Sequence, residues 1–166
     1  MELLFGLASV KYGTAASSNY MPASAAMTTL PNTVKGSVSI DETEGSVTKF
    51  FVDQQLAPVK VLKTEEGELS LVMQIYDMSF ANLAALKGGT GNASGYTPAT
   101  GYTTIEKAME VNLDSGHQIL MYNASIITRV TGGGGRDKMF AIETKITPQL
   151  TGDNAGSWKI VKTVWP

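Results

Sequence analysis

The sequence predicts a mainly β protein, an antiparallel β-sandwich or half-barrel with one short flanking α-helix. Apolar and polar residues alternate through most of the chain from Thr33 onward, which is the period of a half-buried strand. Short turn-type segments separate these runs, and strands joined so closely pair antiparallel because a parallel return needs a long crossover. One stretch alone, residues 79–88, has a convincing helical pattern.

The 166 residues are enough for one hydrophobic core, and two domains are not expected. We expect an N-terminal arm over residues 1–32 and a single β domain over residues 33–166. The arm is rich in Ala, Ser and Thr and has no sustained period, which is typical of an irregular segment. It carries nine large apolar residues that a free arm would leave in water. We therefore expect the arm to lie on another protein surface.

Four strands are predicted in the first half of the β domain. In the first, residues 34–41, Val34, Val38 and Ile40 share one face and polar residues occupy the other. Similar runs follow at residues 47–54, 57–64 and 68–77. The Glu65-Glu66-Gly67 break before the last run is typical of a tight hairpin turn.

The predicted helix begins after Ser79, a good N-cap residue, and ends at Gly88, which suits a left-handed stop. Phe80, Leu83 and Ala84 form its apolar stripe. A helix this short is not stable alone, so the stripe is expected to pack on the sheet. The Gly-, Ser- and Thr-rich residues 88–101 are expected to be a loose loop that orders against a neighbouring molecule.

Four further strands are predicted at residues 103–113, 117–130, 138–150 and 157–165. The run around Tyr122 is apolar on both faces, which predicts the most buried strand of the protein. Residues 132–136 contain four consecutive glycines and are expected to form a mobile hairpin tip.

Sequence motifs for chemistry are weak. The glycines of residues 88–95 follow a helix and miss the spacing of a dinucleotide-binding loop, and residues 132–138 lack the Lys-Ser or Lys-Thr pair of a phosphate loop. His117 is the single histidine and is interpreted as a polar residue that starts a strand. Asn92 and Asn123 begin Asn-Ala-Ser sequons, interpreted as coincidence, and the Asn123 amide is expected to satisfy backbone groups.

Carboxylate pairs are the remaining candidates for acid–base chemistry or calcium binding. Asp41-Glu42 with Glu44 and Glu65-Glu66 are expected in turns, and Glu106 with Glu110 on a solvated strand face. Paired charges cost little in such places and contribute to solubility. We predict no catalytic, cofactor-binding or metal-binding residue, no cofactor, and no enzymatic activity.

Charge and composition narrow the class of partner. The formal net charge is −2 with basic residues scattered along the chain, so the sequence does not favour nucleic-acid binding. There are no cysteines. The N-terminus carries Glu2 where a secretory signal has basic residues, and no stretch has the length of a membrane span. We expect a mature, soluble protein made in the cytoplasm, with no membrane partner.

Three segments together resemble a known family. GSVSIDETEG (36–45) is followed by FFVDQQLAPVKVLKTEEGELSLVMQIYDMSFANLAALKGGT (50–90) and later by QILMYNASI (118–126). The order of a charged hairpin, a strand that ends in Asp, a helix with a glycine stop and a late apolar strand resembles the major tail tube proteins of long-tailed bacteriophages. The likeness covers most of the chain from about Leu30 and is looser in LASVKYG (7–13).

The resemblance implies a structural virion protein that assembles into hexameric rings, which stack head to tail into a tube. It implies that inner strands close into one β-barrel around a lumen through which DNA passes without specific binding. A mildly acidic chain, with one short basic cluster at Arg136–Lys138, fits such a wall. It also implies that the N-terminal arm and residues 88–101 contact other subunits.

The partners implied are other copies of the chain, with tape-measure, baseplate or sheath proteins as candidates. The location implied is the cytoplasm of a bacterial host during assembly and then the tail of the virion. The alternative within the same superfamily is the tube subunit of a contractile injection or type VI secretion system. A carbohydrate-binding β-sandwich is disfavoured because Tyr96, Tyr102, Trp158 and Trp165 are spread along the chain and the export signal expected of such a protein is missing.

Overall fold

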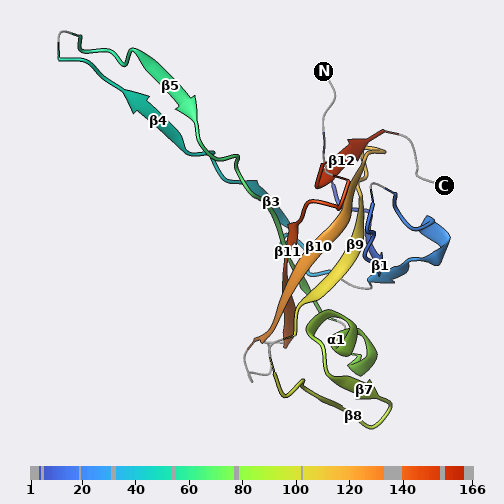
Figure 1. The fold of residues 1–166 in the computed structure, drawn as a ribbon. Coiled ribbons are helices and arrows are strands. Elements are labelled where there is room, and N and C mark those ends of the chain that lie inside the picture. The colour runs from blue at the N-terminus through green and yellow to red at the C-terminus, as the bar shows by residue number, and fades with distance from the viewer. Residues whose placement is uncertain are drawn as a thin grey trace.

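The structure is a computed structural model, and it is mainly β, with antiparallel sheets and one α-helix (Figure 1). It describes residues 4, 6–18, 20–30, 33–53, 55–76, 79–101, 103–132, 140–153 and 156–162. The predicted fold class is therefore confirmed.

One eight-stranded sheet forms the body of the protein, with the strand order β2-β1-β9-β10-β11-β6-β3, and β12 also pairs with β10. All of these pairs are antiparallel. The strands are β1 (Ser9–Thr14), β2 (Thr28–Leu30), β3 (Ser39–Glu42), β6 (Leu69–Ile75), β9 (Ile105–Asn112), β10 (Gln118–Thr131), β11 (Ala141–Pro148) and β12 (Trp158–Val161).

The late strands follow their predicted runs closely. β10 lies at the centre, and its first five residues are all buried, as the run that is apolar on both faces predicted. β11 and β12 share one edge of β10, since β11 pairs with residues 124–131 and β12 with residues 118–121. Past the end of β11, Gln149 N still donates a hydrogen bond to Asn123 O of β10 at 2.7 Å.

The sheet curls until its two edges approach each other. Thr33 bridges Ile75 at one edge, yet only two residues separate it from Leu30 at the end of β2 on the other edge. Three residues of chain span at most about 11 Å. In a flat sheet the six spacings from β2 to β3 would span about 29 Å. The chain therefore requires strong curvature, which is the half-barrel of the predicted fold.

Hydrophobic side chains pack on both faces of the sheet. One face carries the larger core, which includes Leu71, Met109 and Met121 together with Leu83 and Leu86 of the helix α1 (Phe80–Lys87). The other face carries Ala108, Leu120 and Tyr122, which Met21 and Met27 cover. Since Leu120 and Met121 are adjacent in β10, the two cores lie on opposite sides of the same strands.

The N-terminal segment differs from the irregular arm that was expected. Residues 9–14 and 28–30 are strands of the main sheet, and a short 3-10 helix, η1 (Ser24–Ala26), lies between them. Val10, Met21 and Leu30 are buried in this chain's own cores. These apolar residues thus pack on the chain's own sheet, whereas Leu4 and Tyr20 of the same segment are exposed.

Residues 39–75 form one long hairpin. Its inner part is the β3–β6 pair, and its outer part is the pair of β4 (Val47–Phe50) and β5 (Lys60–Lys63), which extends away from the body (Figure 1). The turn predicted at Glu65-Glu66-Gly67 is wrong. Residues 64–68 run alongside residues 43–46, with Thr43 N bonded to Glu68 O at 3.0 Å and Thr64 N to Ser46 O at 2.8 Å. The chain reverses between β4 and β5 instead.

The helix has the predicted caps. Ser79 Oγ accepts a hydrogen bond from Asn82 N at 3.3 Å, and Gly88 ends the helix with φ of 80°. Of the predicted stripe only Leu83 is buried, with Leu86 beside it, whereas Phe80 is exposed. Both buried leucines face the sheet.

The loose loop predicted at residues 88–101 is wrong for most of its length. Residues 90–97 form a hairpin, β7 (Thr90–Asn92) and β8 (Gly95–Thr97), that packs on α1 (Figure 1). Tyr96 Oη donates a hydrogen bond to Gly88 O at 2.8 Å. Asn92 Oδ1 accepts from Ser94 N and Gly95 N at the turn, which is an Asx-type turn.

Candidate functional site

The outer part of the long hairpin is the most unusual surface of the described chain. We call residues 47–63 the extended hairpin. All of its described residues are exposed. Eighteen large hydrophobic side chains are exposed in the described residues, and eight of them lie here: Val47, Phe50, Phe51, Val52, Leu56, Val59, Val61 and Leu62. An apolar surface this concentrated marks a contact site more often than chance exposure.

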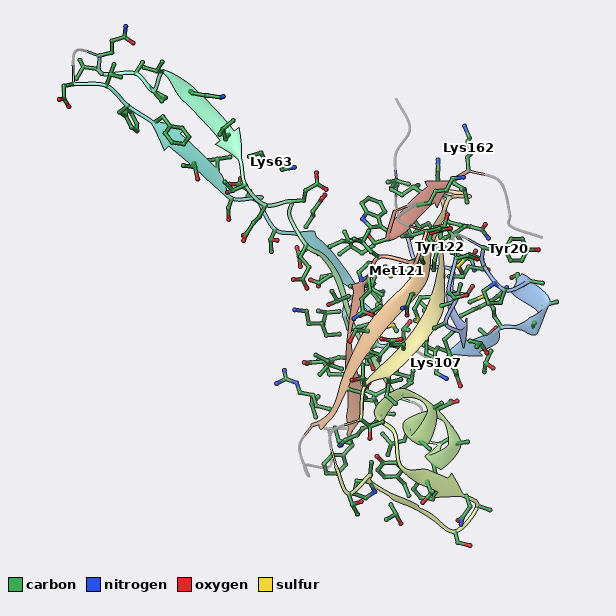
Figure 2. The ribbon with its side chains drawn as sticks, in the orientation of Figure 1. Tyr20, Lys63, Lys107, Met121, Tyr122 and Lys162 are labelled. Carbon is green, nitrogen blue, oxygen red and sulfur yellow. The ribbon has the colours of Figure 1, made fainter. Side chains whose placement is uncertain are left out.

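Both faces of this two-stranded ribbon are apolar. Val61 lies opposite Lys49, and Leu62 lies opposite Thr48 on the next rung. Successive residues of a strand point to opposite faces, so each face of the ribbon carries apolar side chains. Figure 2 shows side chains standing on both sides of the ribbon without a layer over either. A lone two-stranded hairpin is only marginally stable in water, so the ribbon needs contacts beyond its own strands.

The acidic residues at the base of the ribbon come together. Asp41, Glu42 and Glu44 lie on one strand of the junction and Glu65, Glu66 and Glu68 on the other, and we call these six residues the acidic collar. Two separate acidic turns were predicted here, but the six acidic residues form one exposed belt. Within it Ser46 Oγ donates to Glu65 at 3.1 Å, and Lys63 Nζ lies 3.5 Å from a Glu66 oxygen.

Beside the collar, the helix-bearing face of the sheet opens into an apolar groove of about 890 Å³. It lies where β9 ends and β6, β10 and β12 are near, and we call it the end groove. Ile40 and Leu69 line one side of it, and Trp158 and Ile160 line the other. Ile40 and Ile160 are exposed. The hydrophobic core thus continues to the surface at this end, whereas α1 covers the sheet around Ile126 and Thr128 at the other.

A buried polar cluster lies on the opposite face. The side chain of Glu110 is fully buried, and its Oε1 is 3.3 Å from Lys11 Nζ. Ser24 Oγ and Asn112 Nδ2 donate hydrogen bonds to the same oxygen at 3.1 and 2.8 Å. Ser24 belongs to η1, so the cluster ties the N-terminal segment to β1 and β9. Charged hydrogen bonds of this kind are the stronger ones in proteins.

Glu106 and Glu110 are therefore not a carboxylate pair on a solvated face, as the sequence had suggested. Glu106 is exposed, but Glu110 is buried and held by Lys11. Four residues of strand also separate them by about 13 Å. The predicted solvated face is wrong at Glu110 because the N-terminal segment covers that part of the sheet.

The other candidates have structural surroundings. His117 is buried at the start of β10, with Nδ1 3.0 Å from Ser115 Oγ. Asn123 lies at the irregularity between β9 and β10, and its Oδ1 has no hydrogen-bond partner among the described residues. The expectation that this amide satisfies backbone groups is thus not met by that oxygen. Asn92 makes the Asx-type turn.

Several sequence predictions fall outside the described residues. These are the glycine-rich tip beyond Gly132, the basic cluster Arg136–Lys138, and the aromatic residues Tyr102 and Trp165. Within the described ranges, no group of three or more His, Asp or Glu side chains is arranged to hold a metal ion. No α-helix among these residues has the length and apolarity needed to cross a membrane.

The exposed apolar surface of the extended hairpin was not predicted from the sequence. The signal was present, because Phe50-Phe51-Val52 breaks the alternation of β4 and makes both faces apolar. The same pattern in β10 marks a strand covered on two sides within the chain. The sequence alone does not distinguish a strand that is covered by its own chain from a strand that is covered by another molecule.

Comparison of this chain with protein-family models and with curated proteins finds no match.

Proposed function

We propose that this protein is a structural subunit that assembles with copies of itself into stacked hexameric rings, forming a tail tube of the bacteriophage type. The observation that carries the proposal is the extended hairpin, with eight exposed large apolar side chains on two faces. Such a ribbon has no cover in a lone subunit, and a second copy is the partner always present at equal concentration.

The curvature of the sheet supports the same proposal. Strands that close on themselves lose the free edges along which proteins aggregate. The described sheet curves in this direction without closing, since β2 and β3 remain its two edges, and a long ribbon lies outside the body (Figure 1). Assembly then takes place through the ribbon of one copy and a different patch on the next copy. Contacts of this kind, repeated head to tail, generate rings or filaments.

The remaining parts of the proposal follow from the resemblance. The chain acts without catalysis, DNA passes through the lumen without specific contacts, and tape-measure, baseplate or sheath proteins meet the ends or outside of the tube. Assembly takes place in the cytoplasm of a bacterial host, and the finished tube belongs to the virion tail.

The test is assembly of the purified protein over a range of concentrations, measured by sedimentation velocity and negative-stain electron microscopy. We expect stacked rings with six-fold symmetry above a critical concentration. The variant Phe50→Ser/Phe51→Ser/Leu56→Ser is expected to fold with an unchanged free energy of unfolding and to stay as single subunits. These side chains are exposed, so their loss removes no core contact.

The matched control is Ile127→Ser/Leu150→Ser, which removes exposed apolar side chains elsewhere on the surface and is expected to assemble like the wild type. Wild-type protein that sediments as single subunits at every concentration, and also in the presence of its initiator complex, would contradict the proposal. So would a triple variant that forms tubes as readily as the wild type.

A further inference from the structure

The extended hairpin and the acidic collar have opposite charge. The hairpin carries Lys49, Lys60 and Lys63 against one acid, Asp53. The collar has six acids, and no Lys or Arg occurs in residues 39–46 or 64–68. Both sets of side chains are exposed. Complementary potentials of this kind select a partner and its orientation more than they raise affinity.

Lys63, at the inner end of the hairpin, lies 3.5 Å from Glu66 of its own collar, but the outer residues of the hairpin cannot reach the collar of the same chain. The two are consecutive parts of one ribbon, and residues 47–63 continue outward from the collar (Figure 1). Six residues of strand, from Gly45 to Phe51, already separate them by about 20 Å. A basic ribbon on this acidic collar must therefore come from another molecule.

The end groove supplies the apolar part of the same receptor. Ile40 and Leu69 line the groove, and Glu42 of the collar, which pairs with Leu69 and lies two residues beyond Ile40, is on the same face of the sheet. A ribbon that lies across this place meets an apolar groove and an acidic margin together. The extended hairpin offers the matching combination, large apolar side chains with lysines among them. The groove, at about 890 Å³, has room for several side chains rather than one.

We infer that the extended hairpin of one copy docks on the next copy, with its apolar side chains in the end groove and its lysines on the acidic collar. This inference rests on the proposed self-assembly and names the contact that makes it. The donor and receptor surfaces are different patches, so the contact is heterologous and leaves one free patch at each end of a growing assembly. A closed ring satisfies all of them.

Charge reversal tests the contact. One variant, Lys49→Glu/Lys60→Glu, makes the hairpin net acidic, and another, Glu42→Lys/Glu44→Lys/Glu65→Lys/Glu68→Lys, makes the collar net basic. Each alone places like charges across the contact. We expect the critical concentration of each variant to rise roughly tenfold or more relative to wild type.

The two variants mixed in equal amounts should assemble again, because each hairpin then finds a collar of opposite charge on the other variant. A chain with all six substitutions should assemble alone for the same reason. The free energy of unfolding of every variant serves as the folding control. A mixture that assembles no better than its components would overturn the inference, as would single variants that behave like wild type.

Disulfide trapping gives an independent readout, since the chain has no cysteine of its own. Leu56→Cys mixed with Ile160→Cys should form a cross-linked dimer on mild oxidation. Leu56→Cys with Ile127→Cys should not, although Ile127 is also exposed. Equal cross-linking in both mixtures would overturn the inference. Wild-type protein that forms tubes while these tests fail would leave the proposed function standing; wild-type protein that never assembles would remove both.

Discussion

At the scale of single residues, Glu110 Oε1 is held by Lys11, Ser24 and Asn112. Replacing Lys11 with Met removes the cation beside it and leaves a fully buried carboxylate with neutral donors only. We expect Lys11→Met to lower the free energy of unfolding by about 2–3 kcal/mol, somewhat below the usual cost of breaking a buried ion pair because Ser24 and Asn112 remain. Urea unfolding at a concentration below assembly measures it.

The matched variant is Glu110→Gln, which removes the charge but keeps the shape. Lys11 is partly exposed and can turn to water, so this change should cost about 1 kcal/mol. The order of the two effects is the informative part. If Lys11→Met proved no more costly than Glu110→Gln, the carboxylate would not depend on its cation in the way described.

Tyr122 gives a prediction about alkaline pH. Burial raises the pKa of its phenol, and the nearby negative charge of Asp153 raises it further. The unfolded chain then releases this proton first as pH rises through about 10. The folded state binds more protons in that window, so the free energy of unfolding falls as pH increases.

We therefore expect wild-type stability to decrease more steeply between about pH 9.5 and 11 than that of Tyr122→Phe, which has no proton to release. Chemical unfolding across this range gives both slopes. Tyr20→Phe is the control variant, because it removes a phenol hydroxyl from an exposed tyrosine. Equal slopes for wild type and Tyr122→Phe would count against the burial of this hydroxyl.

At this scale, the features that depend on residues nearby in the chain were predictable from the sequence. Ser79 and Gly88 were predicted as helix caps because capping depends on residues within one turn. Glu110 was misplaced because its burial depends on Ser24, which lies 86 residues away in the chain. Alternation in β9 shows which face a side chain occupies and leaves open what covers that face.

At the scale of elements, the β7–β8 hairpin depends on glycines that allow close approach. A Cβ at Gly91 would lie 1.9 Å from Phe80 O, the first residue of α1. Gly91→Ala should therefore push the hairpin off the helix and cost about 1–3 kcal/mol, the usual range for overpacking. Thermal or urea unfolding checks this.

Gly95→Ala is the matched control in the same hairpin, because no atom lies within 4 Å of the added Cβ. It is expected to be neutral, or stabilising by a few tenths of a kcal/mol through the lost entropy of the unfolded chain. Should the two substitutions have the same effect, close packing of β7 on α1 would not be the reason for glycine at position 91.

The elements that were predicted wrongly share one cause. Residues 88–101 were expected to be loose because glycine often marks flexible backbone, but Gly91 is required by contact with Phe80. Glu65-Glu66-Gly67 has the composition of a turn, but these residues pair alongside residues 43–46. Composition describes the propensity of a segment, whereas contact with a partner beyond the segment decides its conformation.

At the scale of the whole molecule, the mainly β antiparallel fold was predictable because alternation recurs along the chain and turns are short. The inclusion of residues 9–14 and 28–30 in the sheet was not predictable, since these strands are short and their apolar residues follow no clear period. The exposed position of the extended hairpin was also not predictable from the sequence. Its sequence predicts an ordinary pair of strands, whereas the structure shows that this pair extends away from the body (Figure 1).

The central claim is that the extended hairpin is completed by another copy of the chain, and hydrogen–deuterium exchange measures this most directly. Backbone amides of residues 47–63 are compared in dilute single subunits and in assembled material, with residues 105–112 of β9 as an internal reference. We expect rapid exchange of the hairpin in single subunits and at least about tenfold slower exchange after assembly, while the reference stays slow in both. Assembled protein whose hairpin exchanges as fast as in the single subunit would contradict the claim.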